Sequence, residues 1–193
     1  FGEEFLTEHI IQTWMENLPV LSTFTAERVA YANIISGNQP PATALIRNPY
    51  REWIGAQIRA DLWGWVSPGQ PRRAAEFAWR DARLSHVRNG IYGEIFFAAA
   101  VAAAFKNDRV EDVIREALTF IPANSRFADA IIFVLSLPLQ QKSWDDNVEL
   151  LYKKYDKYHW VHTINNSALV CAALLSANND YEKAICNVVM GGW

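Results

Sequence analysis

The chain has 193 residues, a formal net charge of −3 and a hydrophobic content of 51%. This composition excludes a disordered chain, because disordered chains are poor in apolar residues and rich in net charge. It also excludes the strongly basic surface that binds nucleic acid or an anionic membrane. The apolar stretches are too short or too interrupted to span a bilayer. We therefore expect one globular domain over residues 1–193, with neither nucleic acid nor membrane as its partner.

The chain has two cysteines, Cys171 and Cys186, and neither lies in a CxxC pattern. This usage argues against a thiol-bound zinc ion and against a disulfide framework. Few cysteines without such a pattern are typical of a protein in a reducing compartment. We therefore expect a cytoplasmic protein.

In almost every segment apolar residues recur at three- and four-residue steps, and two-residue alternation is scarce. This periodicity predicts an all-α fold, a globular orthogonal bundle of about ten helices. In chain order the predicted helices cover residues 5–18, 26–35, 54–66, 74–84, 90–105, 110–119, 126–137, 144–157, 167–176 and 181–189, with a loop over residues 36–49. The alanine-rich helix 90–105 is expected at the centre, because small side chains let neighbouring helices approach closely. Residues 126–137 also contain a β-branched run typical of a strand, but their length favours a helix.

Short polar residues, proline and glycine mark the ends of several predicted helices. Thr25 is a candidate N-cap, and Gly37 follows the end of the same helix. Pro71 stands at a first helical position, and Asp108 with Glu111 resembles a capping box. Further predicted ends are N-caps at Asn124 or Ser125, at Ser143 and at Asp180, and a stop at Gly191.

Residues 48–65 carry charged side chains among large apolar ones, including Arg51, Arg59 and Asp61. If Arg59 or Asp61 faces inward it needs a partner, because an unpaired buried charge is costly. Two interpretations follow from the spacing. The segment either forms an internal Arg–Asp pair that holds two helices together, or it provides the polar floor of a binding pocket.

Residues 79–94 place His86 and Asn89 at a junction, because one helix is predicted to end near Ser85 and the next to begin near Gly90. The free N–H groups at the start of a helix bind phosphate, and glycine permits close approach. His86 is therefore a candidate contact for phosphate or ribose. The alternative is that it caps a helix, which is the commoner role of a polar side chain at such a junction.

His159 and His162 lie three residues apart, a spacing at which two side chains can share a helix face and bind a metal ion. No HExxH pattern and no third ligand accompany them in the sequence. The alternative is that they cap the predicted helix that begins at Ser167, with Asn165 and Asn166 satisfying backbone groups. The residues alone thus indicate a helical domain with a polar pocket near the junction at residue 86.

Several blocks of sequence, taken in order, carry a family resemblance. They are GAQIRAD at residues 55–61, RDARLSH at 80–86, NGIYGE at 89–94, the alanine run ending at 105, HTINNSAL at 162–169, DYEKAI at 180–185 and the glycine pair 191–192. In this order they resemble the ADP-ribosylglycohydrolase family, which includes the lens crystallin J1 proteins and the dinitrogenase reductase-activating glycohydrolases. The similarity runs over nearly the whole chain.

The resemblance implies an all-α fold with a cleft that holds two magnesium ions, which orient a ribose and activate water. Enzymes of the family cleave the N- or O-glycosidic bond between ADP-ribose and a modified group. The implied substrate is an ADP-ribosyl or related N-ribosyl group on a small molecule or a protein. By the same resemblance His86 lies near the diphosphate or ribose, and Gly55, Asn89, Tyr92 and Gly93 line the cleft.

The chain departs from the family pattern at two places. Many members carry a glycine- and serine-rich phosphate loop just before the position of Gly55, whereas residues 50–54 here read YREWI. Arg51 and Arg59 remain as candidate substrate contacts. The family's metal ligands come from acidic motifs near its N-terminus and from an Asp-Thr-Asp run after a Gly-Gly pair; this chain begins beyond the first and ends at residues 191–193, where the second begins.

From these departures we expect the core of a longer glycohydrolase, truncated at both ends. The resemblance implies magnesium in the longer protein, whereas this chain alone is expected to bind no metal ion and to hydrolyse nothing. The alternative is a non-catalytic module, either a crystallin-like structural protein or an ADP-ribose-binding domain.

Overall fold

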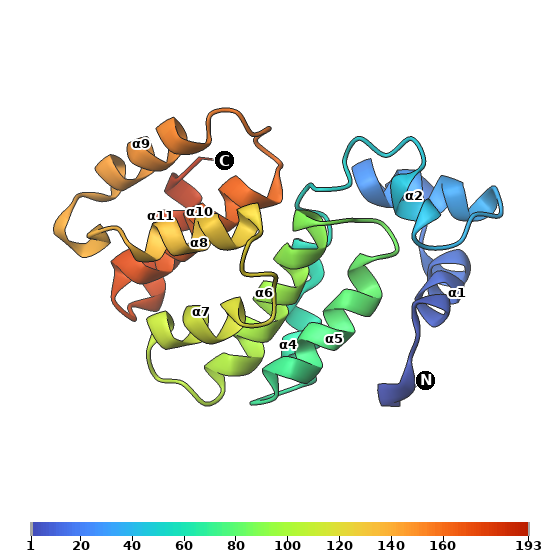
Figure 1. Ribbon diagram of the computed structural model, residues 1–193, viewed down its shortest axis with the longest axis horizontal. Helices are drawn as coiled ribbons and strands as arrows, with labels where there is room; N and C mark the ends of the chain where they lie inside the picture. The colour runs from blue at the N-terminus through green and yellow to red at the C-terminus, as the bar shows by residue number, and fades with distance from the viewer. Residues whose placement is uncertain (1, 193) are drawn as a thin grey trace.

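The computed structural model describes residues 2–192, and every regular element in this part of the chain is a helix (Figure 1). The α-helices are α1 (Thr7–Asn17), α2 (Thr25–Ile35), α3 (Ala42–Leu45), α4 (Asp61–Trp65), α5 (Pro71–Ala82), α6 (Asn89–Ala104), α7 (Val110–Leu118), α8 (Arg126–Leu135), α9 (Trp144–Tyr155), α10 (Thr163–Ala177) and α11 (Tyr181–Met190). Short 3-10 helices lie at Gly2–Glu4, Val20–Ser22, Gln57–Arg59 and Leu139–Gln141; the third of these is η3. The predicted all-α fold is confirmed. None of the described helices is long and apolar enough to cross a membrane.

Two helices form the centre of the bundle. Helix α6 packs against α4, α5 and α7, and α10 packs against α8, α9 and α11, while α6 and α10 also contact each other. The four alanines at 98, 99, 102 and 103 of α6 have no exposed surface. Alanine has no side chain beyond Cβ, so neighbouring helices approach closely along this run, as the sequence predicts. Figure 1 shows α1 and α2 on the side of α5 that faces away from α9 and α11.

The apolar core lies between α5, α6, α8 and α10. Phe96 of α6 and Phe127 of α8 are almost completely buried, and their ring centroids are 5.4 Å apart. Ile131 and Ile164 extend the same cluster toward α10. Residues 126–135 are therefore a buried helix and not a strand, in agreement with the prediction from their length.

Local capping signals predict several helix ends. The hydroxyls of Ser125 and Ser143 and the carboxylate of Asp180 each accept a hydrogen bond from a backbone N–H of the first turn, over 3.1, 3.1 and 2.9 Å. Pro71 is the first residue of α5, and Gly191 ends α11. Gly37 follows α2 with a φ of +82°, a conformation that glycine adopts without strain.

Two predicted caps are wrong. Phe24, not Thr25, is the N-cap residue of α2, and no side chain caps this helix. Helix α7 likewise has Arg109 as its N-cap residue without a side-chain cap. The predicted capping box does not form because the N-cap residue is not Asp108, and the carboxylate of Glu111 accepts a hydrogen bond from the guanidinium of Arg115 at 2.9 Å.

Three predicted boundaries also differ. The single helix predicted for 54–66 is divided into η3 and α4, because backbone hydrogen bonds at Arg59 and Ala60 run to the residue three positions earlier. The predicted loop 36–49 contains α3. Helix α10 begins at Thr163 instead of Ser167, because the imidazole Nδ1 of His162 accepts a hydrogen bond from the Ile164 N–H at 3.2 Å and caps it.

The contact between α4 and α6 requires a glycine. A Cβ on Gly64 would lie 2.4 Å from the Cβ of Val101. We expect Gly64→Ala to lower the free energy of unfolding by about 1–3 kcal/mol through overpacking, measured by urea denaturation. In a Val101→Gly background, which lacks the clashing Cβ and Cγ1 of residue 101, Gly64→Ala should cost less than it does in the wild type. An equal cost of Gly64→Ala in the two backgrounds would show that the two positions are not in contact.

Candidate functional site

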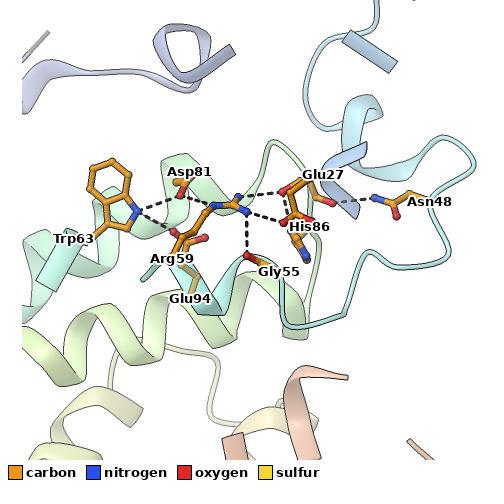
Figure 2. Close-up of polar contacts among 9 residues, drawn as sticks. Glu27, Asn48, Gly55, Arg59, Trp63, Asp81, His86 and Glu94 are labelled. Carbon is orange, nitrogen blue, oxygen red and sulfur yellow. Dashed lines mark hydrogen bonds and ion pairs between the residues drawn. The ribbon is translucent and has the colours of Figure 1, made fainter. Parts of the chain in front are cut away.

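Arg59, at the end of η3, is held by groups from three segments of the chain (Figure 2). Its Nε donates to Asp81 of α5 at 2.8 Å, and one Nη donates to Glu27 of α2 at 2.8 Å and to the carbonyl oxygen of Gly55 at 3.2 Å. The other Nη donates to the hydroxyl of Ser85 at 3.1 Å. The guanidinium thus connects α2, η3 and the end of α5.

A second buried carboxyl group lies beside this cluster. The indole N–H of Trp63 is 3.2 Å from a carboxylate oxygen of Asp81 and 2.9 Å from one of Glu94. Burial, together with the neighbouring charge of Asp81, raises the pKa of Glu94 well above its usual value. Burial also favours the neutral form of Asp81, but the charge of Arg59 and several hydrogen bonds hold the pKa of Asp81 below its usual value. Asp81 is therefore the more acidic of the two groups, and Glu94 is the one that holds a proton more readily.

The internal Arg–Asp pair expected from the sequence is present, but its acid is Asp81 and not Asp61, which is exposed. The sequence analysis did not identify Asp81, Glu94 or Glu27 as functional residues. A signal was available for Asp81, because a carboxylate on the apolar face of α5 also needs a buried partner. For Glu27 no local pattern points to Arg59, which lies 32 residues away in the chain.

His86 is completely buried just after α5. Its Nδ1 lies 2.8 Å from the hydroxyl of Ser85, and its Nε2 has no hydrogen-bond partner among residues 2–192. Burial and the nearby charge of Arg59 lower the pKa of His86 well below its usual value, so the ring is neutral. A ligand reaches this ring only after its neighbours move, and substrate contact at His86 stays a prediction.

The other residues predicted near His86 contribute to helix packing. Asn89 donates to a carboxylate oxygen of Glu52 at 2.6 Å and accepts from the Phe127 N–H at 3.1 Å. Tyr92 packs against the core. Gly93 lies so close to α10 that a Cβ would stand 2.3 Å from the hydroxyl oxygen of Thr163. These contacts join α6 to α8 and α10, and a substrate role for these residues also stays a prediction.

A groove of about 860 Å³ opens above Arg59, between α1, the start of α2 and the segments around residues 54 and 160. Aromatic side chains dominate its walls. They are Trp14, Phe24, Trp53, His159 and Trp160. The rings of Trp53 and His159 are stacked with centroids 4.3 Å apart, whereas Phe24 and Trp160 expose 68% and 65% of their surface.

The groove contains part of the predicted site. Gly55 and Arg59 line it, together with the carboxylate of Glu27. His86, Asn89, Tyr92, Gly93 and Arg51 are not among its lining residues. Arg51 is exposed, and its guanidinium donates to the carbonyl oxygen of Asn48 at 2.9 Å. The sequence therefore identified two groove residues and none of the aromatic walls.

His159 and His162 do not act together in the structure. His159 stacks on Trp53 in the groove, whereas His162 caps α10 and contacts Tyr158 with ring centroids 4.6 Å apart. Within residues 2–192 no three side chains of His, Cys, Asp or Glu are grouped so that they could hold a metal ion.

The magnesium ions that the family resemblance implies do not fit the groups around the groove. Magnesium prefers an octahedron of oxygen ligands, usually with one or two carboxylates free to bind it. Here the carboxylates of Asp81 and Glu27 are bound to the guanidinium of Arg59. A positive side chain thus occupies the position where these carboxylates converge.

The pH dependence of stability tests the burial of His162. Burial lowers the pKa of His162 to about 4, with Arg126 and His159 acting in the same direction and Glu52 in the opposite one. Below a pH of about 6.5, His162 binds a proton in the unfolded chain but not in the folded chain. The free energy of unfolding therefore falls as the pH decreases from there toward 4.

We expect the wild type to lose more stability than His162→Asn between pH 7 and pH 5, because asparagine keeps a capping acceptor but does not titrate. Each pH unit contributes at most about 1.4 kcal/mol, and less because the ring is partly exposed. Urea denaturation at several pH values measures the difference. Parallel pH profiles of the two proteins would show that His162 titrates normally.

The profile of the ADP-ribosylglycohydrolase family matches residues 4–193. No curated protein and no solved structure gives a significant match. The family profile covers essentially the whole chain, including the blocks that contribute Gly55 and Arg59 to the groove and Asp81 beneath it. The chain therefore belongs to the ADP-ribosylglycohydrolase family.

Proposed function

We propose that the aromatic groove binds an ADP-ribosyl group, and that the protein serves the hydrolysis of the glycosidic bond between ADP-ribose and a modified small molecule or protein. One observation carries this proposal. Gly55 and Arg59, from one of the sequence blocks that resemble the family, lie in the same groove as exposed aromatic rings. The groove volume of about 860 Å³ is within the range of small-molecule sites.

The walls of the groove suit a nucleotide. Aromatic faces stack on nucleobases in a way that tolerates different orientations, and each such contact contributes about 1–3 kcal/mol. Phe24 and Trp160 are more than half exposed, so their rings are available to a ligand without a rearrangement of the core. The ring of Trp53, fixed by stacking on His159, offers a more rigid part of the same wall.

The reaction itself joins a water oxygen to the anomeric carbon of the ribose and breaks the bond from that carbon to the modified group, which leaves with a proton. Among the described residues we assign only binding and orientation to this reaction. No step is assigned to magnesium, because Asp81 and Glu27 are both paired with Arg59. The same observation favours the second candidate for this chain on its own, an ADP-ribose-binding module without hydrolytic activity.

The stacking role of the groove is tested at Trp160. We expect Trp160→Ala to weaken binding of ADP-ribose about 10-fold, which corresponds to the loss of one stacking contact, measured by isothermal titration calorimetry. The matched control is Trp65→Ala, because Trp65 is 62% exposed on α4 and lies outside the groove. Equal affinities of the wild type and Trp160→Ala for ADP-ribose would place the ligand elsewhere.

The role of magnesium is tested with the 193-residue chain itself. Because the carboxylates near the groove are bound to Arg59, we expect ADP-ribose to bind equally well with magnesium and with a chelator. We also expect no release of ADP-ribose from an ADP-ribosylated peptide, followed by chromatography. Magnesium-dependent binding or hydrolysis would contradict the proposal that this chain alone is a binding module.

A further inference from the structure

Glu27 is the carboxylate that the groove exposes to a ligand. It lies in the first turn of α2, and its side chain keeps 20% of its surface exposed where it lines the groove. Its Oε1 accepts a hydrogen bond from Arg59 at 2.8 Å (Figure 2). Asp81, the other carboxylate bound to Arg59, is buried and is not part of the groove lining.

The position of this carboxylate depends on Gly55. A Cβ at residue 55 would lie 2.3 Å from Oε1 and 2.7 Å from Oε2 of Glu27. Both oxygens thus lie directly over the glycine backbone, and any side chain at residue 55 would displace them. The glycine in the GAQIRAD block therefore permits an acidic side chain to reach the floor of the groove.

The carboxylate has unused capacity to accept hydrogen bonds. An ionised carboxyl group offers about four lone-pair directions on its two oxygens. Arg59 takes one of them on Oε1, and Oε2 accepts no hydrogen bond from the residues that the structure describes. The remaining directions are available to a ligand in the groove.

The charges around the groove favour one kind of hydrogen-bond donor on the ligand. The guanidinium of Arg59 is already paired with Glu27. A cationic ligand would meet this positive group, and an anionic group placed against Glu27 would meet its carboxylate. A neutral hydroxyl donor avoids both kinds of repulsion. Carboxylates accept hydrogen bonds from ribose hydroxyls in the same way in dinucleotide-binding folds.

We propose that Glu27 recognises a ribose of the ligand by accepting hydrogen bonds from its hydroxyl groups, with Arg59 and Gly55 holding the carboxylate in place. This inference rests on the proposed function, because the ligand that brings the ribose is the ADP-ribosyl group. It makes Glu27 a specificity-determining residue that distinguishes ribose from deoxyribose.

The test compares two variants and two ligands by isothermal titration calorimetry. The ligands are ADP-ribose and an analogue in which the secondary hydroxyls of both riboses are replaced by hydrogen. We expect Glu27→Gln to bind ADP-ribose about 10-fold more weakly than the wild type and to bind the analogue with unchanged affinity. The matched control is Glu149→Gln, an exposed carboxylate on α9, which should bind both ligands like the wild type.

The outcomes separate this inference from the proposed function. If the wild type does not bind ADP-ribose, the proposed function fails and the inference fails with it. If the wild type binds ADP-ribose and Glu27→Gln binds it equally well, only the inference is overturned. Equal losses of affinity for both ligands would also overturn it, because Glu27 would then act through Arg59 or the shape of the groove.

A third variant keeps the inference testable if Glu27→Gln does not fold. Glu27→Asp keeps the charge and withdraws the carboxylate by about one methylene, so it should also lose affinity for ADP-ribose and not for the analogue. Thermal unfolding of each variant is measured alongside. If Glu27→Gln does not fold, the inference is judged on Glu27→Asp, and unchanged ADP-ribose affinity of that variant overturns it.

Discussion

The guanidinium of Arg59 is the constraint on which this side of the structure depends. Its side chain keeps 25% of its surface exposed where it lines the groove, but its partner Asp81 is buried. Leaving a buried charge without its partner typically costs about 3–5 kcal/mol. Arg59 takes partners from α2, α5 and its own segment, so the positions of these elements are coupled. Helix α2 cannot move away from η3 without separating Glu27 from this charge. The same interaction forms the floor of the groove.

The cluster contains one cation and three carboxyl groups, and burial affects the pKa values of the carboxyl groups. A buried carboxylate is stable only beside a positive group. Asp81 binds Arg59 directly and has a lowered pKa, whereas Glu94 lies beside Asp81 and has a raised pKa. The indole N–H of Trp63 contacts both acids. The two acids therefore differ because one of them binds the guanidinium directly and the other lies beside a carboxylate.

The sequence predicted the parts of the fold that depend on local signals. Helical periodicity located the long helices, and hydroxyl caps such as Ser125 and Ser143 marked their starts. Predictions failed where distant residues decide the local structure. Within residues 54–66, Arg59 binds groups on α2 and α5, which no spacing within the segment reveals. The groove combines side chains as far apart in the chain as Trp14 and Trp160. The spacing of charged residues could therefore indicate Arg59 as a possible pocket residue, whereas Gly55 was indicated only by the family resemblance.

Carboxylates in a binding site can bind a metal ion or accept hydrogen bonds from a ligand, and in this arrangement the two roles are separate. A carboxylate paired with a guanidinium attracts magnesium less strongly, because a positive group already lies beside it, but its remaining lone pairs still accept hydrogen bonds from neutral donors. Glu27 therefore suits recognition and not metal binding. Its neighbours in the groove are aromatic and offer stacking surfaces instead of further charge. We therefore propose that this surface holds a nucleotide by contacts that do not depend on a divalent ion.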